Sequence, residues 1–219
     1  AGSDDLITRT LRTHGKFEVE VANAARKILS QVDPGNVLDI GANIGCFTVP
    51  LATDFPDHLF ISFEPQRTVY RHLVCNLVLN RLDNVDAHQM ALGEETKTVT
   101  LTVPNYSAET NVGGFSLDPQ VRDTIGTTVG NEETIIVTTL DSLTIKNIRL
   151  IKIDVEGLEL SVIKGALTTL ENNNYPPILF ESWGQFDWWT DRNNELQEFI
   201  KSLGYTITRV TKNDYLATR

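Results

Sequence analysis

Apolar positions along the chain alternate between a pattern typical of buried strands and a pattern typical of amphipathic helices. Five short apolar runs bounded by turn-forming residues predict strands, and they cover residues 36–40, 59–64, 85–92, 150–154 and 177–181. Apolar stripes at helical spacing predict helices, and these cover residues 18–31, 43–53, 65–80, 158–171 and a segment containing 195–203. This alternation of strand and helix predicts βαβ units and a mainly parallel sheet.

Two further segments depart from the alternating pattern. Residues 205–210 and 215–218 are close enough in sequence to form a terminal hairpin, which predicts an antiparallel last strand in a seven-stranded sheet. Residues 94–140 contain strand-like stretches separated by glycine-rich polar sequence, and we interpret them as a β-rich insertion. The insertion is too poor in large apolar residues to hold its own core. With a helical segment at 1–33, the chain is therefore predicted to be one domain over 1–219.

Composition narrows the classes of function. The 219 residues carry a net charge of −10, which disfavours nucleic acid as a partner because phosphate backbones are repelled. No apolar run is long enough to span a bilayer, and the N-terminus shows no apolar signal core. Cys46 and Cys75 both lie in apolar sequence and are interpreted as buried thiols of a reducing compartment. These features predict a cytoplasmic protein.

The most informative motif follows the first predicted strand and reads Asp39-Ile40-Gly41-Ala42-Asn43-Ile44-Gly45. In a doubly wound sheet, such a turn lies at the carboxyl end of the strand, where ligands bind. Gly41 and Gly45 permit close approach of the backbone, and Asn43 tolerates a left-handed conformation. A tight strand–helix turn without any ligand remains the alternative.

An acid at the end of the second strand indicates a ligand that contains a ribose, which is true of both NAD and S-adenosylmethionine. Glu64 lies 23 positions after Gly41, where nucleotide-binding α/β folds place an acid that accepts hydrogen bonds from ribose hydroxyls. A dinucleotide site needs a second glycine where Asn43 stands, to admit a pyrophosphate. S-adenosylmethionine has a ribose but no phosphate, so the turn favours it over NAD. Asp39 is then placed to help hold the ligand's ammonium group, directly or through water.

Carboxylates also follow the fourth and fifth strands. Asp154 and Glu156 should face the cofactor's methyl group, where they can position an acceptor hydroxyl or take its proton. They are also suitable ligands for a divalent ion, although the pattern assigns no metal site. Glu156 is alternatively a helix-terminal acid that favours the macrodipole. Glu181 is a third acid on the same rim, and Lys152 either carries an ion pair or reaches that rim.

An aromatic cluster follows the fifth strand. It consists of Trp183, Phe186, Trp188 and Trp189. Its rings are equally suited to form a stacking wall or lid over an apolar or sugar acceptor and to anchor the following helix. The pattern leaves both interpretations open.

In six segments the chain resembles the FkbM-type methyltransferase family. The matching segments, in order, are Leu38–Gly45, Phe63-Glu64-Pro65, Asn76-Leu77 with Leu79-Asn80, Ala91-Leu92-Gly93, Thr139-Leu140-Asp141, and Ile151–Gly157 with Glu159. They lie between about residues 15 and 182, and no match extends beyond Trp183. The resemblance implies a Rossmann-like class I methyltransferase fold and methyl transfer, typically to a hydroxyl of a sugar or a natural product. It also implies that the cofactor site contains Asp39, Gly41, Asn43, Gly45 and Glu64.

Together these observations predict an S-adenosylmethionine-dependent O-methyltransferase. Asp154 and Glu156 are the predicted catalytic residues, and Asp154 also borders the predicted cofactor site. The predicted acceptor is a sugar, glycolipid or natural product. Two alternatives are a protein that binds S-adenosylmethionine without activity and a nicotinamide-dependent oxidoreductase. The sequence predicts neither the identity of the acceptor nor the oligomeric state.

Overall fold

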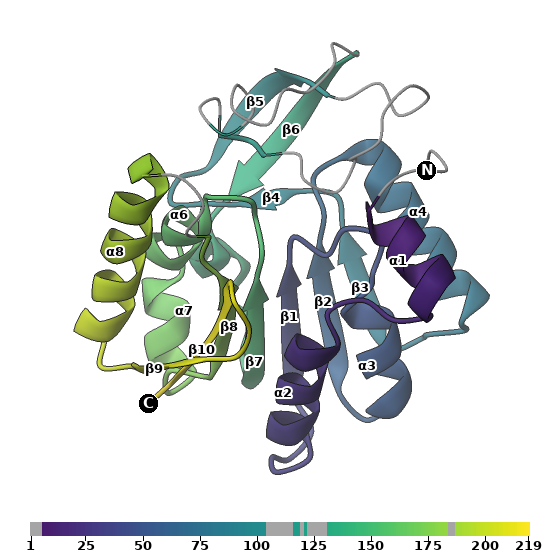
Figure 1. The fold of residues 1–219 in the computed structure, drawn as a ribbon, viewed down its shortest axis with the longest axis horizontal. Helices are drawn as coiled ribbons and strands as arrows, with labels where there is room; N and C mark the ends of the chain where they lie inside the picture. The colour runs from purple at the N-terminus through teal and green to yellow at the C-terminus, as the bar shows by residue number, and fades with distance from the viewer. Residues whose placement is uncertain (1–5, 104–115, 119–120, 122–130, 184–186) are drawn as a thin grey trace.

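A seven-stranded sheet forms the centre of the computed structural model, which describes residues 6–103, 116–118, 121, 131–183 and 187–219 (Figure 1). In spatial order its strands are β3 (Val85–His88), β2 (Leu59–Phe63), β1 (Asn36–Ile40), β7 (Ile148–Ile153), β8 (Ile178–Glu181), β10 (Asp214–Thr218) and β9 (Thr206–Arg209). β10 is antiparallel to both of its neighbours, and the other pairs are parallel. The predicted sheet, including its antiparallel last strand, is confirmed.

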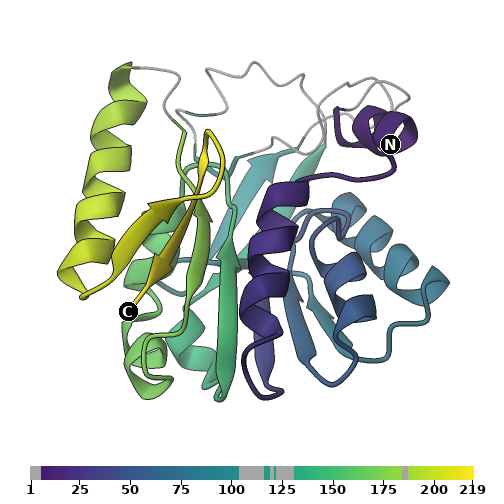
Figure 2. The same ribbon diagram turned by 60° about the horizontal axis from the view of Figure 1, so that its bottom comes forward.

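Helices cover both faces of this sheet. They are α1 (Leu6–His14), α2 (Val19–Leu29), α3 (Thr48–Asp54), α4 (Arg67–Leu79), α6 (Glu159–Lys164), α7 (Leu167–Asn172) and α8 (Asp187–Ser202), with a 3₁₀ turn η1 (Leu140–Leu143). Within β1, Val37 packs with α2 and α3, whereas Leu38 packs with α6, α7 and α8 on the opposite face. Both side chains are fully buried, which explains why the parallel strands are continuous apolar runs. Figure 2 shows α2 lying along the face of β1 and β7.

A small second sheet lies at the carboxyl ends of the main strands (Figure 1). It consists of β4 (Ala91–Leu92), β5 (Lys97–Thr102) and β6 (Glu132–Thr138). The prediction of a single strand over 85–92 is therefore wrong: the chain turns after His88, and Ala91 pairs with Val137 of β6 in the other sheet. The described parts of the 94–140 segment supply β5 and β6, so its predicted strands are confirmed.

The predicted helix over 158–171 is interrupted. It forms α6 and α7 because the backbone of Gly165 packs against Gly93, where a Cβ atom would lie 1.9 Å from the Gly93 carbonyl oxygen. The Asp141 carboxylate then accepts hydrogen bonds from the backbone N–H groups of Thr168 and Thr169 in the first turn of α7. A separate acid thus caps the second helix.

The cysteines and the helices also bear on predictions made from composition. Neither Cys46 nor Cys75 forms a disulfide, but Cys75 is exposed, so its predicted burial is wrong. None of the helices in the described ranges combines the length and apolar character that a membrane crossing requires. The division of the chain into a single domain over 1–219 stays a prediction.

Candidate active site

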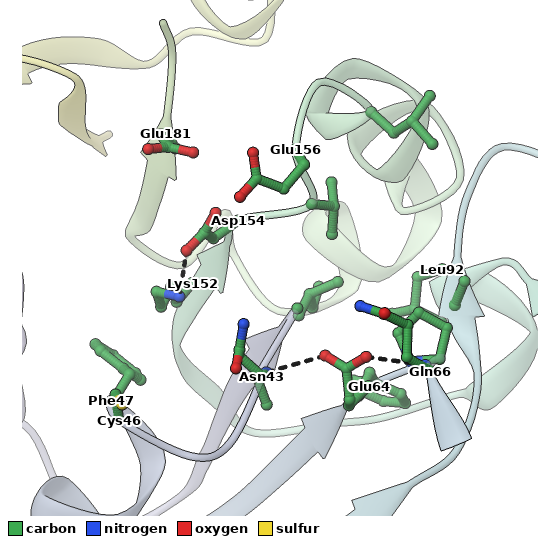
Figure 3. Close-up of a pocket in the computed structure, with 18 of the residues that line it drawn as sticks. Asn43, Cys46, Phe47, Glu64, Gln66, Leu92, Lys152, Asp154, Glu156 and Glu181 are labelled. Atoms are coloured by element: carbon green, nitrogen blue, oxygen red, sulfur yellow. Dashed lines mark hydrogen bonds and ion pairs between the residues drawn. The ribbon is translucent and has the colours of Figure 1, made fainter. Parts of the chain in front are cut away.

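A cavity of about 230 Å³ lies at the carboxyl ends of β1, β2 and β7. β1 pairs with β2 on one side and β7 on the other, and successive connections run in opposite directions from it. This is the switch point at which open α/β sheets bind ligands. Figure 3 shows side chains from all three strands converging here.

The loop after β1 is shaped by three left-handed residues. The φ angles are 86° at Gly41, 51° at Asn43 and 92° at Gly45. These conformations cannot belong to a right-handed helix, so α3 begins at Thr48 and not at the predicted position 43. The Asn43 side chain accepts a hydrogen bond from the Ile44 N–H at 2.8 Å, which stabilises its own left-handed conformation.

Close packing of strands fixes the start of this loop. A Cβ atom at Gly41 would lie 1.8 Å from the carbonyl oxygen of Asp154, so only glycine fits between β1 and β7. The N–H groups of Gly41 and Ala42 both donate to the Phe63 carbonyl at 3.0 Å. Gly41 and Asn43 line the cavity, whereas Gly45 lines a second, adjacent cavity beside α1 and α2.

Glu64 lies directly after β2 with its carboxylate held in the cavity wall. One carboxylate oxygen accepts the Asn43 N–H at 3.0 Å, and the other accepts the Gln66 N–H at 2.9 Å (Figure 3). Burial raises the pKa of Glu64 to about 7, although both hydrogen bonds oppose the shift. Each oxygen keeps a further lone pair, so the carboxylate can accept two more hydrogen bonds from a ligand.

Asp39 lies below the cavity and is absent from its lining. The strand register places it between Ser62 of β2 and Lys152 of β7, and its side chain is fully buried. It accepts a hydrogen bond from the Thr48 hydroxyl at 2.6 Å and lies 3.7 Å from the Lys152 ammonium. Burial raises the pKa of Asp39 despite the lysine. Its Oδ2 atom is thus satisfied by Thr48, whereas its buried Oδ1 atom accepts no hydrogen bond among the described residues. The place of Asp39 in the cofactor site stays a prediction.

Lys152 is the basic side chain among the described residues that line this cavity. Its ammonium lies 3.0 Å from Asp154 and above the ring of Phe47, 5.6 Å from the ring centroid. The nearby acids raise the pKa of Lys152 well above its ordinary value, and they outweigh the opposite effect of burial. Lys152 therefore stays charged and balances Asp39 and Asp154, which resolves the sequence alternatives in favour of both an ion pair and a place in the lining.

Three carboxylates meet at the carboxyl ends of β7 and β8. One oxygen each of Asp154, Glu156 and Glu181 lies within 4.8 Å of the others, and their carboxylates face one another in Figure 3. Burial first, and then the charge of Asp154, raise the pKa of Glu156 well above its ordinary value. Burial first, and then the charges of Asp154 and Glu156, raise the pKa of Glu181 to about 12. Glu156 and Glu181 therefore bind their protons more tightly than ordinary glutamates do.

The backbone of Glu156 is left-handed, with φ 53°, and is followed by Gly157 at φ 100°. Glu159 stabilises this turn, because its carboxylate accepts the N–H groups of Val155 and Gly157, both at 3.1 Å. The turn directs Glu156 into the cavity, where its Oε2 atom is buried and has no hydrogen-bond partner among the described residues. A helix-terminal role for Glu156 is not supported, because α6 begins only at Glu159.

The aromatic cluster contributes one wall residue and one anchor. Trp183 lines the cavity and stacks on Trp189, with ring centroids 5.6 Å apart. Trp189 is 4% exposed, in the first turn of α8. Phe186 and the side chain of Trp188 lie outside the described residues. In the described part of the cluster, Trp183 thus forms part of the cavity wall and Trp189 anchors α8.

Glu18 also lines the cavity, from the segment before α2, although nothing in the sequence predicted it there. It has a left-handed backbone, with φ 47° and ψ 47°, and its side chain does not cap the helix. Burial raises the pKa of Glu18 to about 7, and the charge of Lys152 opposes the shift. No sequence motif marks this residue, because only tertiary structure brings it to the cavity.

The charge of the cavity suits a cationic ligand. Its lining holds one lysine and the carboxylates of Glu18, Glu64, Asp154, Glu156 and Glu181. Burial first, and then the charge of neighbouring carboxylates, raise the pKa values of four of these acids, Glu18, Glu64, Glu156 and Glu181. A ligand with a sulfonium and an ammonium supplies compensating positive charge, and its ribose diol matches the free lone pairs of Glu64. The residues present therefore fit S-adenosylmethionine.

The strand order, the antiparallel β10 and the glycine-rich turn after β1 define a class I S-adenosylmethionine-dependent methyltransferase fold. The Streptococcus mutans protein SMU.1697c, solved in complex with SAH, shares this fold: the TM-score is 0.51 at 12% identity, over 89% of this chain and 94% of that one. The model of the methyltransferase FkbM domain matches residues 39–207. The chain belongs to the FkbM methyltransferase family.

Two fungal proteins are related in sequence. Methyltransferase 1 of Beauveria bassiana (strain ARSEF 2860) is 29% identical over an alignment of 146 positions, which covers 61% of this chain and 59% of that protein. Methyltransferase sdnD of Sordaria araneosa is 29% identical over 205 residues, covering 79% of this chain and 74% of that protein. The chain thus spans less than two thirds of the first relative's length. Both names specify methyl transfer and neither specifies an acceptor.

Proposed function

We propose that the protein transfers a methyl group from S-adenosylmethionine to a hydroxyl group of a sugar, glycolipid or natural product. The carrying observation is the position of Asp154, Glu156 and Glu181, whose carboxylates meet within 4.8 Å in the same cavity as the cofactor loop. An oxygen nucleophile must lose a proton during methyl transfer, and carboxylates at the reacting end can take it. The oxidoreductase alternative is not supported, because the chain belongs to a methyltransferase family.

In this proposal the loop after β1 and two acids hold the cofactor. Gly41 and Asn43 border it, Glu64 accepts hydrogen bonds from its ribose hydroxyls, and Asp154 lies beside it. Asp39 acts indirectly, by holding Lys152 from below. Gly45 acts through the shape of the loop, since it lines the adjacent cavity. When bound, the cofactor supplies an electrophilic methyl group.

The chain's own groups then orient the acceptor and take its proton. Glu156 is the proposed proton acceptor, because its Oε2 atom is buried in the cavity and accepts no hydrogen bond among the described residues. Its pKa is raised, so it must first lose its own proton to solvent, which the positive charge of a bound cofactor favours; once ionised, it can take the proton of the acceptor hydroxyl. Asp154 is fixed by Lys152 at 3.0 Å and orients the hydroxyl by accepting its hydrogen bond. Trp183 provides an apolar face that excludes water and suits the C–H face of a sugar.

The acidic cavity also restricts the acceptor. A phosphodiester at its mouth would face several carboxylates, which supports a neutral acceptor and disfavours nucleic acid. The cytoplasmic location stays a prediction based on cysteine usage and composition.

A labelled-methyl transfer screen tests the proposed function. The protein is incubated with methyl-labelled cofactor and sugars, glycolipids or polyketide-like alcohols, with and without Mg²⁺. With an acceptor in hand, E156Q is expected to lower kcat by about 10²–10⁴-fold while S-adenosylhomocysteine (SAH) binds as in wild type. Glu195 on the exposed surface of α8 provides the matched control E195Q, which should keep full activity.

Three outcomes would contradict parts of this proposal. Wild-type turnover in E156Q would eliminate Glu156 as the proton acceptor. Methylation restricted to amines or nucleobases in the screen would eliminate the hydroxyl class. SAH binding without transfer to any compound would favour the alternative of an inactive cofactor-binding protein.

A further inference from the structure

Among the described acids of the cavity, Glu18 has no role in the function proposed above. Glu64 is held by two backbone N–H groups, Asp154 pairs with Lys152, and Glu156 and Glu181 form the cluster with Asp154. Glu18 lines the same cavity but does not cap α2. Its carboxylate is thus available to a ligand.

The position of Glu18 corresponds to the end of the ligand opposite the ribose. Glu18 directly precedes α2, which packs against β7. In agreement, the charges that act on it include those of Lys152 and Asp154 at the end of β7. Glu64, in contrast, follows β2 on the other side of β1. A ligand whose ribose contacts Glu64 and whose remainder runs toward β7 therefore presents its amino-acid end to Glu18.

That end carries an ammonium group, which needs an acceptor. Asp39, the residue expected from sequence to serve it, is fully buried below the cavity, is absent from the cavity lining and forms an ion pair with Lys152 at 3.7 Å. Glu18 is only half-buried and lines the cavity directly. We infer that Glu18 binds the α-ammonium of S-adenosylmethionine and is the residue through which the N-terminal segment recognises the cofactor's amino-acid end.

The backbone supports this inference independently. A glutamate in the left-handed region is strained, because its Cβ crowds the following carbonyl, and this cost is not offset by a helix cap. Strained backbone is concentrated at functional sites, and Glu18 shares its left-handed conformation with two other residues of the cavity lining, Asn43 and Glu156. Glycine at this position would relieve the strain and remove the carboxylate, so stability and ligand binding should respond in opposite directions.

Binding of three ligands to purified protein tests the inference without any acceptor. The ligands are SAH, its 2-oxo analogue, which lacks the ammonium but keeps the carboxylate, and 5′-methylthioadenosine, which lacks both. E18Q is expected to weaken SAH binding by about 10–100-fold, which is the effect of losing a hydrogen bond to a charged group. It should leave the other two ligands within about threefold of wild type. E20Q is the matched control, because Glu20 is exposed on the first turn of α2.

The readouts separate a ligand contact from a structural role. E18Q and E18G are expected to melt at or above the wild-type temperature when ligand-free, and E18G should weaken SAH at least as much as E18Q. Equal loss of all three ligands in E18Q, or unchanged SAH affinity, would overturn the inference. A lowered melting temperature of the ligand-free E18Q variant, together with weaker binding of all three ligands, would also overturn it. The inference rests on the cofactor and not on the acceptor: wild-type protein that binds SAH but methylates no hydroxyl contradicts only the proposed function.

Discussion

Replacing Glu64 by glutamine should separate the two consequences of burying this carboxylate, which are a cost to the ligand-free fold and a gain in cofactor affinity. Glu64 is 4% exposed, and burial raises its pKa from 4.5 to about 7. Because the folded-state pKa is raised, the folded protein binds this proton more tightly than the unfolded chain does. The stability that this group contributes is therefore fully present below pH 4.5 and is lost as the pH rises toward 7.

The pKa shift of Glu64 corresponds to about 3 kcal/mol of unfolding free energy, lost between pH 4.5 and 7. In E64Q this contribution disappears, so stability should fall less steeply over the same range. Glutamine can accept from only one of the Asn43 and Gln66 N–H groups, which costs about 1–3 kcal/mol at every pH. E64Q should accordingly be less stable than wild type near pH 5 and close to it near pH 8.

Cofactor affinity, in contrast, should only fall in E64Q. At pH 8 the ionised carboxylate accepts charge-assisted hydrogen bonds from the ribose hydroxyls, and its loss should weaken SAH about 10–100-fold. Calorimetric titration measures this effect, and urea unfolding from pH 5 to 8 measures the stability. The control is E133Q, because Glu133 is also buried and accepts a backbone N–H, from Arg67, but does not line the cavity. SAH affinity unchanged in E64Q, or reduced equally in E133Q, would refute the reasoning.

Three other substitutions test the surrounding structure. G41A should lower the melting temperature by more than about 5 °C and abolish SAH binding, because its Cβ would lie 1.8 Å from the Asp154 carbonyl oxygen; a stable variant that binds SAH would contradict this packing. K152M should cost about 3–5 kcal/mol in urea unfolding, because it leaves the Asp154 carboxylate without its cation, and a wild-type midpoint would contradict the ion pair. In a C75S background, which removes the exposed thiol of Cys75, SAH should slow alkylation of Cys46, which lines the cavity. A rate independent of SAH would place the ligand elsewhere.

Local sequence predicted the parts of the fold that depend on local physics. The limits of β1 follow from a run of apolar residues bounded by turn formers, and the structure gives the same limits, Asn36–Ile40. The loop after it was predicted from Gly41, Asn43 and Gly45, whose backbones are all left-handed. Its length was underestimated, because periodicity does not reveal how many positions before α3 adopt positive φ.

Features that depend on distant contacts escaped prediction. The break between α6 and α7 arises where Gly165 meets the backbone of Gly93, more than seventy positions earlier in the chain. The burial of Asp39 between Ser62 and Lys152 likewise follows from the pairing of β1 with β2 and β7 and not from its local sequence, while its place in the cofactor site stays a prediction. Glu18 is a third case, since nothing nearby in sequence indicates that it reaches the cavity.

The same arrangement explains why an excess of acids persists in the cavity of a stable fold. Asp39 and Asp154 share the charge of Lys152, so β1 and β7 are held together by a buried ion pair that does not depend on ligand. The other acids, Glu18 and Glu64 among them, have raised pKa values and can stay protonated until a cation arrives. Their ionisation then gives a cationic ligand charged partners that the ligand-free fold does not have to sustain. The fold thus separates acids that stabilise it from acids reserved for binding, and residue type alone does not distinguish the two groups.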